Sequence, residues 1–217
     1  MDMNIAGRGT IFPGSYKNIK ISGRATATGV VNCTGLEVSG KFESKTVSCS
    51  GLVRVSGSSY FENDMKAGGV DISGSLKCDK SVTITGESKI MGSLSCANLK
   101  AENMVVRGSV KCESDIEAEN VSVIGMIYCD GKLKAKELEI KIEGGAKLNI
   151  GSIECPKISI APEYLPKNLA NRHDAGVITV GEIVGDDIYL ENVIADVVKG
   201  KNVTIGEGCE IGKVEME

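Results

Sequence analysis

Val70-Asp-Ile72-Ser-Gly74, Met104-Val-Val106-Arg-Gly108 and Val121-Ser-Val123-Ile-Gly125 are versions of one motif, within a repetitive stretch that runs from Val70 to Glu137. Written in rows at the spacing of these copies, the chain starts further rows at Ile19, Leu36, Val53 and Leu138. The row around Glu87 is out of step, because its Gly92-Ser-Leu94-Ser-Cys96 unit comes one position late and the next copy comes correspondingly early. A fixed period marks an array of similar supersecondary units.

Each row contains three pairs of apolar residues with one polar residue between the members, as in Val70 and Ile72, Leu76 and Cys78, and Val82 and Ile84. Alternation with a period of two places both members on one side of a strand. Strands this short must pair with the same strand of the next row. The predicted fold is therefore all-β, a single-stranded parallel β-helix with coils of about 17 residues. Right-handed winding is expected because parallel crossovers are overwhelmingly right-handed, and left-handed winding is the alternative.

The period also predicts how the chain is divided. Residues 1–18 carry no clear period and are expected to form an N-terminal arm or cap. Residues 19–160 form the β-helix, and residues 161–176, with two prolines and no alternation, are expected to form a loop. Alternation returns after Val177, so residues 177–217 are predicted to form further coils or a closing cap.

Composition excludes several functions. The formal net charge is -4 and Lys and Arg are scattered singly, so no nucleic-acid partner is expected. No apolar run approaches the roughly 18 to 20 residues of a membrane span, and the first residues lack the features of a signal peptide. A soluble cytoplasmic protein is the expectation.

The cysteines are the most regular candidate site. Four of the eight occupy the same place in successive rows: Cys78, Cys96, Cys112 and Cys129. They should stack as a ladder with neighbouring Cα atoms about 4.8 Å apart, which would allow a disulfide. A cluster of thiolates could also hold a soft metal. However, four ligands in a straight line cannot surround one tetrahedral ion. We therefore predict a buried core ladder of reduced thiols without metal.

Other candidate sites are weak. His173 is the only histidine and lies in a polar stretch, whereas a general base needs a positioned partner. We predict no catalytic residue, no cofactor and no metal ligand. Val203-Thr-Ile205-Gly-Glu-Gly-Cys209-Glu-Ile211-Gly is similar to one coil of the hexapeptide acyltransferases, but a single match carries little information.

The rows resemble the bactofilins, a bacterial polymer-forming cytoskeletal family. The resemblance covers about Ile19 to Ile160 and rests on the x-Ile/Val-Ser/Thr-Gly and Gly-Ser-apolar-x-Cys units, and on the segments Ala135 to Ala146 and Gly151 to Ile160. It implies a right-handed β-helix that stacks end to end into filaments without nucleotide and scaffolds cell-envelope or cell-shape machinery. The implied partners are the chain itself and envelope-associated proteins. The implied location is the cytoplasm, with a peripheral place at the inner face of the membrane as the alternative.

The ends of the coil are the predicted site of self-association, because a terminal row has only one neighbour and presents unpaired backbone groups. The residues expected there are Ile19, Ile21 and Val31 at one end and Val203, Ile205 and Ile211 at the other. Two alternatives remain open: a left-handed β-helix enzyme of the acyltransferase type, and a monomeric β-helix module that binds a ligand on one face.

Overall fold

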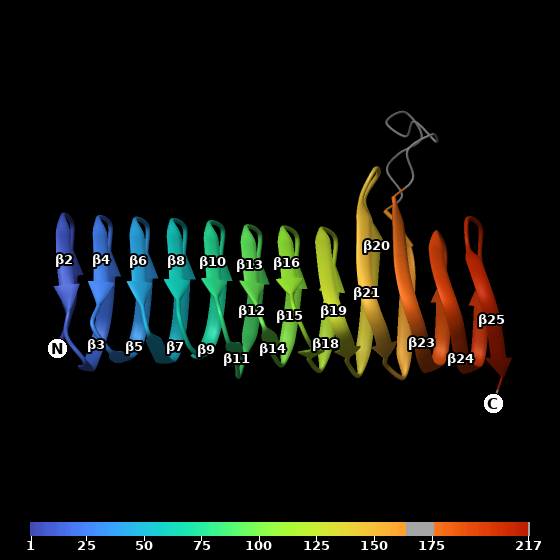
Figure 1. Cartoon of the computed structure of the whole chain (residues 1–217), viewed down its shortest axis with the longest axis horizontal. Coiled ribbons are helices and arrows are strands. Elements are labelled where there is room, and N and C mark those ends of the chain that lie inside the picture. Colours follow the sequence, from blue (N-terminus) through green and yellow to red (C-terminus); the bar gives the residue numbers. More distant parts are fainter. Residues whose placement is uncertain (164–175, 217) are drawn as a thin grey trace.

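The computed structural model describes residues 1–163 and 176–216. Within these residues all regular secondary structure is β-strand and no helix occurs. The strands wind into a parallel β-solenoid of about 12 turns, with ~17-residue coils. Figure 1 shows a long rod in which the coils stand side by side and the two chain ends lie at opposite ends. The predicted all-β parallel solenoid is confirmed, and its right-handed winding stays a prediction.

The first half of the rod contains β1 (Met3–Ile5), β2 (Arg8–Ile11), β3 (Gly14–Ile21), β4 (Arg24–Ala27), β5 (Val30–Val38), β6 (Lys41–Ser44), β7 (Thr46–Val55), β8 (Ser58–Phe61), β9 (Met65–Ile72), β10 (Ser75–Cys78), β11 (Ser81–Ile84) and β12 (Glu87–Ile90). The second half contains β13 (Ser93–Cys96), β14 (Asn98–Lys100), β15 (Asn103–Val106), β16 (Ser109–Cys112), β17 (Ile116–Glu117), β18 (Asn120–Val123), β19 (Met126–Lys134), β20 (Glu137–Ile142), β21 (Lys147–Glu154), β22 (Lys157–Pro162), β23 (Val177–Leu190), β24 (Val193–Ile205) and β25 (Glu210–Met216).

Three faces run the length of the rod, and every strand pairing between coils is parallel. Face 1 begins with β1 on the second half of β3, where Met3 pairs with Ile19 and Ile5 with Ile21. Face 2 begins with β2 on β4. Face 3 begins where the first residues of β3 pair with those of β5. Each coil thus contributes to each face either one short strand or one segment of a longer strand, as β3 does on faces 3 and 1.

Alternate side chains point into the rod and form one continuous core. In β10 the pattern is exposed, buried, exposed, buried, so Leu76 and Cys78 point inward while Ser75 and Lys77 point outward. The irregular row also has the predicted register, because Ser88 pairs with Val70 in the coil before it and with Met104 in the coil after it. One residue is gained and then lost, while the inward column stays continuous. Ser88 itself is buried, so a polar residue occupies a position that is apolar in most coils.

Bulky and small residues compensate one another in the core. Phe42 pairs with Ser59 and Ser44 with Phe61 in the adjacent coils of β6 and β8. The two phenylalanine rings meet edge to face with centroids 5.8 Å apart. Serine next to phenylalanine therefore keeps the cross-section nearly constant, as close packing requires.

Glycine marks the corner between faces 1 and 2. A Cβ placed on Gly57 would lie 2.0 Å from the carbonyl oxygen of Gly40, and the same clash recurs at Gly40 and Gly74. The Gly57 N–H donates to the carbonyl of Val38 at 3.1 Å in the preceding coil. The corners of successive coils are too close for any side chain on the inner side of the turn.

The N-terminal residues differ from the expected arm. β1 and β2 pair in register with β3 and β4, so these residues form the first coil of the solenoid. Its alternation was obscured because Gly7, Gly9 and Pro13 interrupt a short segment. At the other end, β23, β24 and β25 continue the parallel pairing as further coils. The predicted loop lies mostly outside the described residues, and its first two residues, Ala161 and Pro162, end β22. Among the described residues, no helix has the length and hydropathy needed to cross a membrane.

Candidate functional site: the ends of the solenoid

The N-terminal end is formed by different residues from those predicted. Ile19, Ile21 and Val31 are only 0 to 1% exposed. Ile19 and Ile21 are buried because Met3 and Ile5 of β1 pair with them. Val31 is likewise covered, because Gly14 pairs with it. The prediction that these three residues form the end was therefore wrong by one coil. The sequence signal for the true first coil was the pair Met3 and Ile5, which precedes Ile19 and Ile21 by one row.

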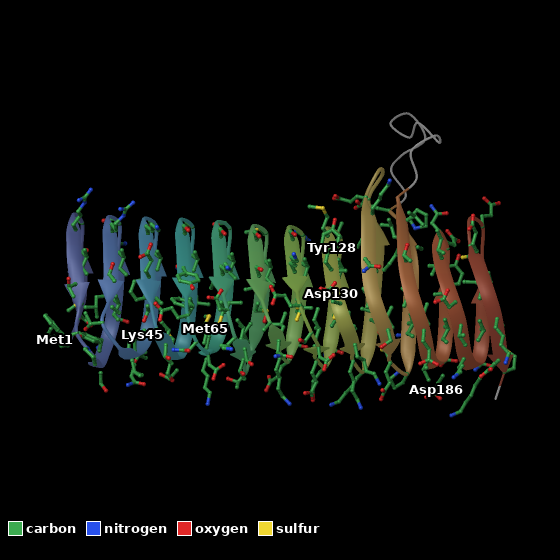
Figure 2. The ribbon with its side chains drawn as sticks, viewed as in Figure 1. Met1, Lys45, Met65, Tyr128, Asp130 and Asp186 are labelled. Carbon is green, nitrogen blue, oxygen red and sulfur yellow. The ribbon has the colours of Figure 1, made fainter. Side chains whose placement is uncertain are left out.

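The first coil covers part of its own interior, although Met3 and Ile5 remain only partly buried. The side chain of Ile5 lies across Gly9, where an added Cβ would be 3.1 Å from Ile5 Cγ2. Ile11 is fully buried. The Tyr16 hydroxyl donates to the carbonyl of Phe12 at 2.8 Å. Apolar exposure at this end is concentrated on Phe12 and on Met1, which lies at the tip of the rod (Figure 2).

The C-terminal end leaves its apolar residues open. Ile205 is 43% exposed, whereas Leu190, which occupies the same column one coil earlier, is fully buried. Val203 and Ile211 are partly exposed, and their role in self-association stays a prediction. Val214 and Met216 are also exposed, although the sequence analysis did not single them out. We call this surface the C-terminal edge; it consists of Val203, Ile205, Cys209, Ile211, Val214 and Met216.

The four cysteines of the predicted ladder lie inside face 2. Cys78, Cys96, Cys112 and Cys129 are buried, and none is in a disulfide. Cys112 pairs in register with Cys96 on one side and with Cys129 on the other. Burial raises the pKa of the Cys78 thiol, which keeps it in the protonated form that binds metals poorly. Among the described residues, no group of three or more His, Cys, Asp and Glu side chains is placed to hold a metal ion.

The structure adds cysteines that the sequence analysis did not group. Cys33 and Cys49 pair in register on face 3, in the first half of the rod. Cys155 is also buried, whereas Cys209 is partly exposed at the C-terminal edge. Cys33 and Cys49 end the third apolar pair of their rows, whereas the four ladder cysteines end the second pair. Comparing the third pairs of successive rows would therefore have found this second column. His173 lies outside the described residues.

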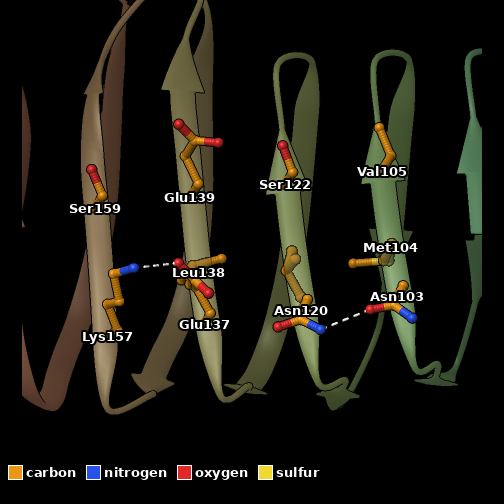
Figure 3. A pocket seen from close by; sticks show the side chains of 11 residues that line it. Asn103, Met104, Val105, Asn120, Ser122, Glu137, Leu138, Glu139, Lys157 and Ser159 are labelled. Atoms are coloured by element: carbon orange, nitrogen blue, oxygen red, sulfur yellow. Dashed lines mark hydrogen bonds and ion pairs between the residues drawn. The ribbon is translucent and has the colours of Figure 1, made fainter.

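The outer side of face 1 carries a shallow depression of about 540 Å³ (Figure 3). Four of its polar side chains are paired with each other across coils. The Asn120 Nδ2 donates to Asn103 Oδ1 at 2.7 Å, and the Lys157 Nζ donates to Glu137 Oε1 at 2.6 Å. Such pairs hold neighbouring coils in register and are half solvated, so they form a regular surface of the rod.

These features define a class of protein: a straight parallel β-solenoid with a regular core and an open apolar edge at one end. Residues 67–165 match the Bactofilin family model, described as polymer-forming cytoskeletal, which confirms the predicted resemblance over these residues. The solenoid and this match together support a polymer-forming cytoskeletal protein.

A curated relative gives a shorter match. The chain is similar to the uncharacterized protein YhbF of Bacillus subtilis (strain 168), with 52% identity over 42 residues. The match covers 19% of this chain and 18% of that protein. No solved structure matches the chain.

Proposed function

We propose that this chain is a non-enzymatic structural protein that associates with further copies of itself, end to end, and forms filaments. The filaments would scaffold cell-envelope or cell-shape machinery in the cytoplasm, including the inner face of the membrane. The family description supports polymer formation. The coil geometry supports the end as the contact, because stacking is the only way in which a solenoid buries the apolar face of each coil.

The observation that carries this proposal is the C-terminal edge. Interior positions of the same columns, such as Leu190 and Val198, are fully buried, whereas Ile205 and Val214 are 43% and 41% exposed. A further coil placed on β24 and β25 would bury these side chains. It would also pair the backbone N–H and C=O groups on the outer edge of these strands, which otherwise form a template for another chain.

Coil lengths favour this function over the acyltransferase-like enzyme. The sequence separation between register partners on face 1 is not constant, since the step from Val70 to Ser88 is longer than the step from Ser88 to Met104. Enzymes of that class are built on equal hexapeptides, which would give coils of constant length. The uneven coils instead suit a scaffold in which only the stacking of one coil on the next matters.

Electron microscopy of the purified chain, without added nucleotide, tests the proposal. We expect filaments of the width of one solenoid whose length increases with protein concentration. Ile205→Asp should prevent them, because it places a carboxylate in the contact. An elongated monomer at all concentrations would contradict the proposal and favour the monomeric binding module, while binding of an acyl donor would favour the enzyme.

A further inference from the structure

We propose that a patch on the side of the rod, at the corner between faces 1 and 2, binds an acidic, partly apolar peptide segment of a partner protein. The patch consists of Met91, Val105, Ile124 and Met126 around Arg107, and we call it the corner patch. The inference concerns the side of the rod, so it does not rest on the end-to-end association. Three features support it: exposed apolar side chains, the sign of the charge at this corner, and the depression beside it.

The strand register brings the residues of the corner patch together. Met91, Arg107 and Ile124 each follow the last inward residue of a face 1 strand, and these inward residues pair in register from coil to coil. The three residues therefore lie in one line along the corner, with neighbours about 4.8 Å apart. Val105 comes two positions before Arg107 on the outer side of β15, and Met126 comes two positions after Ile124. The corner patch thus spans adjacent coils.

The apolar side chains of the corner patch are open to solvent. Met91 is 57% exposed, Met126 42% and Val105 38%, while Ile124 is partly exposed. Earlier coils hold serine at the corner position of Met91 and Ile124: Ser22, Ser39, Ser56 and Ser73. The register partner of Met126 in the preceding coil is also a serine, Ser109. Because serine suits the fold at these positions, the larger apolar side chains are not there for packing within the rod.

The corner that carries the patch is basic. From β2 to β19, the charged residues directly after face 1 and at the start of face 2 are all of one sign: Arg8, Arg24, Lys41 and Arg107. In the next coil, Lys141 and Lys147 lie on either side of Glu143. The corner between faces 2 and 3 holds Lys45 and Lys80 but is mostly acidic: Glu62, Asp64, Asp79, Glu113, Asp115 and Asp130. Although the whole chain has a net charge of -4, an acidic partner is therefore attracted to the corner between faces 1 and 2.

The corner patch continues into the shallow depression on face 1. Val105 belongs to both, since it also lines the depression of about 540 Å³ (Figure 3). The amide groups of Asn103 and Asn120 and the hydroxyl of Ser122 line it too. Such groups hydrogen-bond to a peptide backbone. A segment that crosses the corner can therefore place one side chain in the depression and others against the methionines.

These features favour a peptide over other anionic partners. Methionine adapts its shape and is common at surfaces that bind varied peptides. A bilayer would not follow the depression beside Val105, and the corner patch contains none of the Trp residues typical of a membrane interface. Single-stranded nucleic acid would need a continuous basic groove with aromatic side chains for stacking. The expected segment instead carries Asp or Glu to meet Arg107, and large apolar side chains to cover Met91 and Met126.

Selection from a random peptide library tests this chemistry. A phage library of random peptides is selected on the immobilised wild-type chain at low salt. We expect the enriched sequences to combine Asp or Glu with Leu, Ile, Met or Phe. A synthetic peptide with the enriched consensus is then titrated against the chain and its variants by fluorescence anisotropy. No enrichment, or enrichment of basic or purely polar sequences, would overturn the proposal.

Substitution of both methionines tests the apolar contact. Met91→Ser together with Met126→Ser installs the residue that neighbouring coils hold, so the chain should stay folded by circular dichroism. We expect the Kd for the consensus peptide to rise about tenfold. Leu52→Ser is the matched control, because Leu52 is also 42% exposed but lies at the start of face 1, outside the corner patch. The same loss of affinity in both variants would contradict the proposal.

Charge reversal tests the electrostatic contact. Arg107→Glu should also raise the Kd roughly tenfold at low salt, and the difference from the wild type should shrink as salt is added. Lys66→Glu is the control, since it changes the net charge equally at an exposed position on face 3. If Lys66→Glu weakens binding as much as Arg107→Glu does, the peptide responds only to the total charge and the proposal is wrong.

Titrations with phosphatidylglycerol vesicles and with single-stranded RNA distinguish the other partners. If either binds more tightly than the consensus peptide, and Arg107→Glu abolishes that binding, the corner patch binds lipid or nucleic acid and the proposal is refuted. All titrations use the chain at concentrations below assembly. Peptide binding by a chain that forms no filaments at any concentration would therefore contradict the proposed function and leave this inference intact.

Discussion

The Cys112 Sγ donates to the carbonyl oxygen of Ala97 at 3.1 Å, across the corner that joins face 2 to face 3. Ala97 lies in the preceding coil. The same relationship links Cys78 to the carbonyl of Asn63 at 2.9 Å and Cys129 to that of Ser114 at 3.0 Å. The thiol is thus a small core residue with a weak donor that faces a corner carbonyl, which explains cysteine at this position better than a metal site does.

Thiol labelling should separate one cysteine from the other seven. At concentrations below assembly, we expect a thiol reagent to modify Cys209 rapidly in the folded chain, because it is the partly exposed cysteine. Cys33, Cys49, Cys78, Cys96, Cys112, Cys129 and Cys155 should react only as fast as the solenoid unfolds. Mass spectrometry of the modified chain identifies the sites. Rapid labelling of Cys112, or one zinc ion per chain after purification without added metal, would refute the structural role.

A carboxylate placed in the core should unfold the rod, whereas one on its surface should not. Val123→Asp puts a charge at a fully buried position, so the free energy of unfolding should fall by about 4 kcal/mol or more. Thr83→Asp is the control: Thr83 points outward, and its register partners are Lys66 and Lys100, which would attract the new charge. Chemical denaturation of both variants measures the difference. Equal losses would show that the inward and outward assignments are wrong.

The corner glycines should not tolerate a side chain. Gly57→Ala would place a Cβ 2.0 Å from the carbonyl oxygen of Gly40, so two coils must separate or the corner must distort. We expect a loss of about 2 to 4 kcal/mol in the free energy of unfolding, typical of strain in a packed structure. Gly14→Ala is the control, because its nearest neighbouring atom is 3.8 Å away. A thermal melt in which both variants behave alike would contradict the close approach of the corners.

End and interior positions should respond differently to charge. Ile205→Asp should abolish assembly while leaving the monomer folded, because Ile205 is 43% exposed. Ile21→Asp should instead unfold the chain, since Ile21 is fully buried between β1 and β5. Circular dichroism measures folding and sedimentation measures assembly. A folded Ile205→Asp variant that still forms wild-type filaments would refute the end contact and point to lateral contacts.

The ion pairs around Glu154 predict an acid-sensitive stability. Lys132, and then Lys134, lower the pKa of Glu154 from 4.5 to about 2. A carboxylate with a lowered pKa stabilises the fold above its ordinary pKa, so this contribution is lost as the pH falls from about 4.5 to about 2. Lys132 shows the opposite sign: Glu154 raises its pKa above 10.5, so that contribution is lost in alkali.

Glu154→Gln should therefore flatten the pH dependence of the melting temperature between about pH 4.5 and pH 2, compared with the wild type. The effect should be modest and should shrink at high salt, because both partners are exposed. Glu113→Gln removes an exposed acid that forms no ion pair among the described residues, and it serves as the control. A Glu154→Gln curve that follows the wild type over this range would show that the pairs do not contribute.

The coil itself was predictable from the sequence because its information is local. Only a few residues are needed to specify a strand with period-two alternation and the corner that follows it. Each coil then repeats the register of the coil before it. Val70, Leu76 and Val82 therefore revealed three faces, and the shared position of four cysteines revealed a buried column. Even the irregular row around Glu87 was predictable, since its neighbours fixed the register on both sides.

The ends were decided only by the tertiary structure. Ile21 lies in the first or in the second coil from the N-terminal end, depending on whether Met3 and Ile5 add one more coil. A strand as short as β1 has too little alternation for the sequence to show this. Similarly, the exposure of Val214 and Met216 depends on what stacks on β25, which lies beyond the local pattern. Likewise, only the register of the folded coils carries one column of outward residues along the whole of face 2, from Thr10 to Glu210.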